Sequence, residues 1–160
     1  MKAEPLNIDA AEQFTIESEL FGSLSVPAEQ AFEFPDGLYG FPEAKKFVLI
    51  PAEPEGFYWL QSLDHGPLVF LLGDPFVFVP DYLVDLGEAE LGPLATDQPS
   101  DLAVLAIVTL PKESDGLPTL NLQGPITLNV RTRLGRQVVV ADCVYGIRWT
   151  LDFRITRMAS

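Results

Sequence analysis

The stretch from Phe57 to Leu86 decides the fold, and it reads FYWLQSLDHGPLVFLLGDPFVFVPDYLVDL. Turn-forming segments rich in Asp, Gly and Pro divide it into three short apolar runs, Phe57–Leu63, Leu68–Leu72 and Phe76–Val79. Aromatic and β-branched residues dominate these runs, and such side chains favour a pleated, packed surface over a helix. The stretch therefore predicts three buried strands joined by turns, and the chain is expected to leave the sheet at the proline that follows.

Alternating apolar and polar residues extend the β pattern to both sides of this stretch. From Phe14 to Val26 the alternation is interrupted by Gly22, which permits a turn and predicts a hairpin. Pro42 at a possible helix start predicts one helical turn near Glu43, and Asp85 before and Gly92-Pro93 after predict a short helix at Glu88–Leu91. Further strands are predicted over five runs: Phe32–Phe34, Phe47–Ile50, Leu102–Val108 as a fully buried strand, Thr119–Val130 as two strands or one bulged strand, and Gln137–Val144.

The segment Ile147–Ile155 has the strictest alternation in the chain. It places Trp149, Leu151 and Phe153 on one face and charged residues on the other, which predicts a half-buried antiparallel strand. This strand is expected to bury Trp149 and to stabilise the domain.

The patterns together predict an all-β, single-domain, antiparallel β-barrel-like fold over residues 1–160, with one or two very short helices. A chain of 160 residues is long enough to fold around one core without disulfides. Residues 1–13 show no periodic spacing of apolar residues and are expected to form a flexible arm. Residues 147–160 are expected to form an extra strand and a tail.

Charge and composition restrict the classes of partner. Ten Lys and Arg against 23 Asp and Glu give a formal net charge of −13, which repels phosphate backbones and anionic lipid headgroups or serves solubility alone. Direct nucleic-acid binding is therefore not expected. Apolar runs stay well below the ~20 residues of a membrane span, and the first residues lack the apolar core of a secretory signal. These observations predict a cytoplasmic protein without membrane contact, which we expect to be a monomer.

Residues suited to catalysis or metal binding are scarce. His65 is the one histidine and lies between Asp64 and Gly66, where a turn residue is expected. Cys143 is the one cysteine, and its apolar surroundings predict a buried, inert thiol. One histidine and one cysteine cannot form an imidazole-and-thiolate zinc site, so we expect no metal and no cofactor.

An acidic cluster directly after the aromatic run is the best candidate for a site. Acidic residues beside exposed aromatics are typical of a protein-binding patch, although a solvated acidic face accounts for the same pattern. Two further interpretations remain open: an acidic β-barrel hydrolase that uses a carboxylate pair, and a barrel that holds a small apolar ligand. The candidate partner-binding residues are Phe76, Phe78, Asp81, Tyr82, Asp85, Glu88 and Glu90.

A series of short motifs runs in order through most of the chain. They are FPDGLYGF at 34–41, KFVLIP at 46–51, FYWLQS at 57–62, DPF at 74–76, PDY at 80–82, LAIVT at 105–109, and Ala-Asp at 141–142 leading to Tyr145. Together they resemble the FliW family of bacterial flagellar assembly factors. The resemblance implies a small β-barrel-like protein without enzymatic activity.

The resemblance also implies partners. Members of this family bind newly made flagellin in the cytoplasm and, when free of it, bind and antagonise the translational repressor CsrA. Flagellin and CsrA are therefore the expected partners. Two features depart from the family pattern: Asp74 stands where members usually carry asparagine, and the chain continues past Arg148, close to where members typically end.

Overall fold

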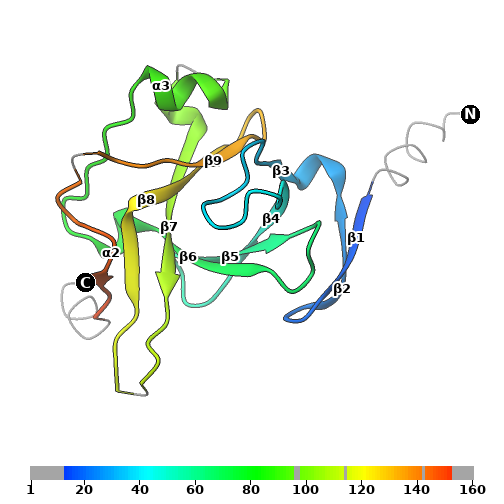
Figure 1. The fold of residues 1–160 in the computed structure, drawn as a ribbon, viewed down its shortest axis with the longest axis horizontal. Coiled ribbons are helices and arrows are strands. Elements are labelled where there is room, and N and C mark those ends of the chain that lie inside the picture. Colours follow the sequence, from blue (N-terminus) through cyan, green and yellow to red (C-terminus); the bar gives the residue numbers. More distant parts are fainter. Residues whose placement is uncertain (1–12, 96–97, 114, 142, 153–160) are drawn as a thin grey trace, which may run out of the picture.

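The fold is that of a computed structural model that describes residues 13–95, 98–113, 115–141 and 143–152. Antiparallel strands dominate it (Figure 1). The hairpin strands are β1 (Gln13–Ser18) and β2 (Gly22–Pro27). The main-sheet strands are β3 (Phe32–Glu33), β4 (Lys46–Pro51), β5 (Phe57–Ser62), β6 (Val69–Gly73), β7 (Leu102–Thr109), β8 (Thr119–Asn129), β9 (Gly135–Gln137) and β10 (Trp149–Thr150).

The main sheet curls into a nearly closed barrel. Its strands follow the order β10-β8-β7-β6-β5-β4-β3, and β9 pairs with β8 beside this path. A parallel bridge between Glu33 and Leu134 connects β3 to the residue before β9, which brings the two ends of the sheet together. The all-β, antiparallel, barrel-like fold predicted from the sequence is thereby confirmed, and the β1–β2 hairpin lies at one side of the barrel (Figure 1).

The helices are short. They are α2 (Pro75–Phe78), α3 (Glu88–Leu91) and the 3₁₀ turns η1 (Ala28–Gln30), η2 (Gly92–Leu94) and η3 (Pro99–Asp101). The bounds of α3 match the predicted helix. None of the helices in the described ranges is long and apolar enough to cross a membrane.

The third apolar run, Phe76–Val79, lies largely in the helix α2, so the strand predicted there is wrong. Asp74 precedes α2, and its Oδ1 accepts a hydrogen bond of 2.9 Å from the backbone N–H of Phe76. Pro75 occupies the first helical position, where its fixed φ and missing N–H suit a helix start. This local capping outweighs the β propensity of the aromatic residues. As a result, Phe76 projects from a helix outside the sheet.

The helical turn predicted near Glu43 is also absent. The backbone of Leu38 and Phe41 forms a two-residue bridge, with N–H to O distances of 3.1 Å and 2.7 Å. Gly37 precedes this bridge and Gly40 lies in its turn, with φ values of 66° and 87° that glycine adopts without steric cost. The glycines therefore tighten the loop into a small hairpin before a helix can start.

Three strand predictions in the second half of the chain are refined by the tertiary structure. β8 is one bulged strand, because its register against β7 shifts between Leu105 and Ile107. β7 is confirmed as a strand, but its first residues are half-buried. The strand predicted over Gln137–Val144 is wrong beyond its first residue, because β9 ends at Gln137. Val138 and Val140 still donate to the carbonyls of Pro125 and Gln123. Neither bond is returned, because Pro125 has no N–H and the N–H of Gln123 donates to Asn121 Oδ1.

The strand predicted over Ile147–Ile155 is shorter than expected. β10 pairs only Trp149 and Thr150 with the first residues of β8, because β8 begins at Thr119. Leu151 is 2% exposed and continues the inward face, as predicted, whereas Trp149 is half-buried. The predicted residues after position 152 lie outside the described part of the chain, as does most of the predicted N-terminal arm.

Three apolar clusters form the core, and the smallest, made of Val26, Val48 and Leu63, joins the β1–β2 hairpin to the barrel. The first fills the barrel and includes Phe34, Phe47, Leu60, Leu72, Ile126 and Leu128. The second lies under α2 and the last described segment, and it includes Phe57, Val79, Tyr82, Leu120, Leu122 and Leu151. The second cluster matters for function, because the candidate site is built on top of it.

Candidate functional site

A row of four aromatic rings crosses the surface beside α2. Phe76 meets Tyr82 edge to face at 5.0 Å, Tyr82 meets Tyr145 at 5.2 Å, and Tyr145 meets Trp149 at 5.8 Å between ring centroids. Phe76 at one end of the row is 58% exposed, whereas Tyr82 is buried. The row therefore joins residues from α2, the segment after it and the C-terminal part of the chain into one aromatic surface.

The hydroxyl of Tyr145 holds the turn that follows α2. Its Oη accepts a hydrogen bond of 3.2 Å from the backbone N–H of Leu83 and donates to the carbonyl of Asp81 at 3.4 Å. Asp81 has a φ of 55°, a left-handed conformation that aspartate tolerates better than most residues. Held in this way, Leu83 points outward and is 81% exposed.

A groove of about 690 Å³ lies beside the aromatic row, between residues 82–90 and residues 138–145. Leu122, Val138, Cys143 and Tyr82 contribute to its apolar lining. Leu83 and Val144 also line it, and Val144 is 87% exposed. Large apolar side chains this exposed are costly in water unless a partner covers them.

The thiol of Cys143 belongs to this groove. It is half-buried, in contrast to the buried thiol predicted, and its Sγ donates to the carbonyl of Leu122 at 3.4 Å. Tyr82 lies nearby, and burial raises the pKa of its hydroxyl to about 12, with smaller contributions from Cys143 and Tyr145. Its Oη has no hydrogen-bond partner among the described residues. The hydroxyl therefore stays protonated at neutral pH and is available to donate.

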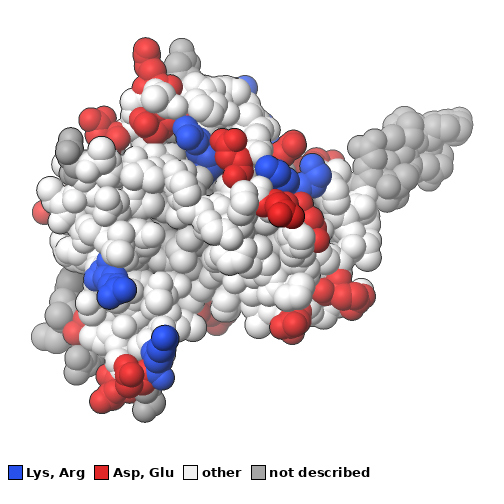
Figure 2. Space-filling model, in the orientation of Figure 1, with Lys and Arg blue, Asp and Glu red and all other residues white. Residues whose placement is uncertain are grey.

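The predicted acidic residues divide between the groove and its surroundings. Asp85 and Glu90 line the groove, whereas Asp81 and Glu88 are exposed outside its lining. Glu90 Oε1 also accepts a 2.7 Å hydrogen bond from the N–H of Gly87, which caps α3. Acidic side chains lie mostly toward the margins of the face drawn in Figure 2, with a broad uncharged area between them.

The structure thus brings together part of the predicted set and adds residues that sequence reasoning missed. Tyr82, Asp85 and Glu90 line the groove and Phe76 lies next to it, whereas Phe78 packs on Phe57 at 4.8 Å and belongs largely to the core. The missed groove residues include Leu83, Val138, Val139, Val140, Val144 and Tyr145. Of the three consecutive valines, Val138 is buried, Val140 is half-buried and Val139 is exposed. The strand predicted over Gln137–Val144 did not indicate that this run forms a groove wall.

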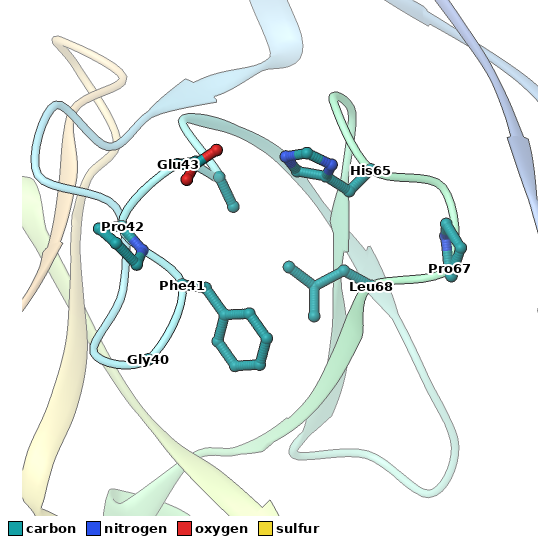
Figure 3. Close-up of a pocket in the computed structure, with 8 residues that line it drawn as sticks. Gly40, Phe41, Pro42, Glu43, His65, Pro67 and Leu68 are labelled. Carbon is teal, nitrogen blue, oxygen red and sulfur yellow. The ribbon is translucent and has the colours of Figure 1, made fainter.

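A second, smaller pocket of about 480 Å³ lies between the 40–44 loop and the β5–β6 turn. Phe41 and Leu68 face each other across it, with Glu43 and His65 at its far end (Figure 3). His65 is in the predicted turn, where its N–H donates to Ser62 Oγ at 2.9 Å. Within the described ranges, no three His, Cys, Asp or Glu side chains are grouped as metal ligands.

Substitution of Asp74 tests how much the hydrogen bond that caps α2 contributes to stability. Asparagine and aspartate cap helices about equally, so Asp74→Asn should change the free energy of unfolding by less than about 0.5 kcal/mol. Asp74→Ala removes the acceptor for the N–H of Phe76 and should lower it by about 1 kcal/mol. Urea denaturation of the two variants measures the difference, and equal losses would show that the cap contributes nothing.

The fold and the surface place the protein in a structural class, that of a nearly closed antiparallel barrel with an apolar groove beside a row of aromatic rings. The sequence model of the FliW protein family matches residues 15–151. A crystal structure of the flagellar assembly factor FliW superposes with a TM-score of 0.78 at 33% identity and covers 86% of this chain and 96% of that one.

Named relatives agree with this match. The flagellar assembly factor FliW of Treponema denticola is 39% identical over 127 residues, 79% of this chain and 86% of the relative. The protein of the same name from Leptospira interrogans is 37% identical over 134 residues, 83% of this chain and 89% of the relative. The chain therefore belongs to the FliW family of flagellar assembly factors.

Proposed function

We propose that this chain is a non-enzymatic, cytoplasmic assembly factor that binds flagellin and, when free of flagellin, binds and antagonises the translational repressor CsrA. The observation that supports the proposal best is the exposed apolar groove with Asp85 and Glu90 on its lining. A surface that combines large exposed apolar side chains with a charged rim is typical of protein-binding sites.

Charge supplies the mechanism of antagonism. A repressor that binds RNA needs a basic surface to neutralise phosphates. A partner with a net charge of −13 is attracted to that surface and, once bound beside it, repels the phosphates of the RNA. Flagellin and CsrA then compete for the same molecule, so that synthesis of flagellin follows its export.

Reversal of the local charges tests this mechanism. Changing Asp81, Asp85, Glu88 and Glu90 to lysine should slow association with CsrA about tenfold at low salt and flatten the salt dependence, because rim charges act mainly on encounter. Stopped-flow or surface-based kinetics over a range of ionic strength measures both effects. Circular dichroism accompanies the kinetics, because Glu90 also caps α3.

A matched control separates the local field from the net charge. Four exposed acidic residues on other elements, reversed together, leave the same net charge as the groove variant: Glu19, Glu29, Asp36 and Glu113. This control should associate with CsrA faster than the groove variant does. Equal rates for the two variants would mean that net charge alone drives encounter and that the groove is not the contact.

A further inference from the structure

The two walls of the groove carry backbone groups that lack hydrogen-bond partners within the described part of the chain. On one wall, Val138 and Val140 donate to the carbonyls of Pro125 and Gln123 at 2.9 Å and 2.8 Å. N–H groups of successive residues in an extended chain point in opposite directions, so that of Val139 points away from β8. It donates to no described residue. The segment therefore runs beside β8 beyond the end of β9, and its outer side is unpaired among the described residues.

The opposite wall shows the same feature. Leu83 at its start donates to Tyr145 Oη, and Gly87 at its end donates to Glu90 Oε1. Between these two residues, the backbone of residues 84–86 makes no hydrogen bond to another described residue. The groove thus runs between two strips of unpaired donors and acceptors, which readily pair with an added strand.

The floor of the groove adds an independent observation. Tyr82 is 5% exposed and its Oη is buried without a hydrogen-bond partner among the described residues. Buried polar groups are nearly always paired, and an unpaired one at a groove points to a ligand that supplies the missing acceptor. A backbone carbonyl of an inserted chain is such an acceptor.

Side chains restrict what the inserted chain can be. The lining is apolar where Leu122, Val138 and Cys143 contribute to it, and the charged residues in the lining, Asp85 and Glu90, are both acidic. Alternate side chains of an extended segment point to opposite sides, so one apolar residue can face the floor while its neighbour faces the rim. The acidic rim favours a lysine or arginine at the neighbouring position.

We propose that the groove binds an extended segment of a basic partner protein by strand addition, with backbone hydrogen bonds to Val139 and to residues 84–86. The segment places an apolar side chain on the floor and a lysine or arginine beside Asp85 and Glu90. This inference rests on the proposed function, in which CsrA is the basic partner. Main-chain hydrogen bonds then supply affinity, and the floor and rim supply specificity.

Proline at the edge position tests the backbone contact. Val139→Pro removes the outward N–H and is compatible with an edge strand, whereas Val139→Ala shortens the same side chain and keeps the N–H. We expect the proline variant to bind CsrA about tenfold more weakly than the alanine variant, with similar melting temperatures, because one main-chain hydrogen bond and its neighbours are lost. Calorimetric titration of the full-length variants with purified CsrA measures the ratio.

Hydrogen exchange provides the second measurement, and it applies to the unsubstituted chain if the proline variant does not fold. The amide of Val139 should exchange rapidly in the free protein and at least about tenfold more slowly in the complex with CsrA. A complex that forms with equal affinity for both variants, or with unchanged exchange at Val139, overturns strand addition and leaves the proposed function intact. Absence of any complex with either CsrA or flagellin overturns the proposed function itself.

Discussion

Replacing Phe47 with alanine is expected to lower the free energy of unfolding by about 3–5 kcal/mol. The side chain is 0% exposed and packs edge to face against Phe34 at 5.0 Å, with Phe70 at 6.4 Å. It lies on β4 in the middle of the barrel core, where close-packed neighbours cannot collapse fully into the space left behind. A domain of this size is stable by about 5–15 kcal/mol, so the loss is a large part of the total.

Chemical denaturation followed by tryptophan fluorescence measures this effect. Phe76→Ala is the matched control, because it removes the same ring from an exposed position on α2 and should cost less than about 1 kcal/mol. A loss at Phe47 no larger than the loss at Phe76 would show that the barrel interior relaxes far more than a packed core does.

The same Phe76→Ala variant should have its main effect on binding. Phe76 is the exposed end of the aromatic row and is supported from beneath by Tyr82 at 5.0 Å, so a partner that covers the groove also covers this ring. Central aromatic residues of interfaces commonly contribute about 2 kcal/mol or more, which corresponds to an affinity about 30-fold weaker. Most of the change is expected in the dissociation rate.

A remote aromatic serves as the control for binding. Phe21 is half-buried in the turn between β1 and β2, a hairpin that lies on the other side of the barrel from α2 (Figure 1). Phe21→Ala should leave the dissociation rate of the CsrA complex within about twofold of the unsubstituted protein. If Phe76→Ala dissociates at the unsubstituted rate while remaining folded, the partner does not contact α2, and the candidate site must be placed elsewhere on the surface.

Predictions from the sequence succeeded where local pattern and long-range packing agree. The β1–β2 hairpin follows from alternation around Gly22, and the apolar runs at β5, β6 and β7 became strands because each fits between two neighbours of the sheet. The α2 segment shows the opposite case. Its aromatic residues favour a strand, but the cap by Asp74 and the position of Pro75 start a helix.

The candidate site was predicted only in part for a similar reason. Tyr82, Asp85 and Glu90 stood out because acidic and aromatic residues are close together in the chain. Val139 and Val144 come from a segment about fifty residues later, and their apolar side chains would ordinarily be assigned to a core. Val139 remains exposed because its segment bonds to β8 on one side and no described strand pairs with the other side.

The order of apolar and polar residues along this chain was enough to establish a β fold, its hairpin and its principal strands, because side-chain period and turn chemistry are properties of neighbouring residues. Closure of the barrel, the aromatic row and the groove depend on contacts between distant segments: Glu33 with Leu134, Tyr82 with Tyr145, and Leu83 with Tyr145. Such contacts form only when the sheet has folded and brought those segments together, since each one requires a partner whose position local sequence does not specify.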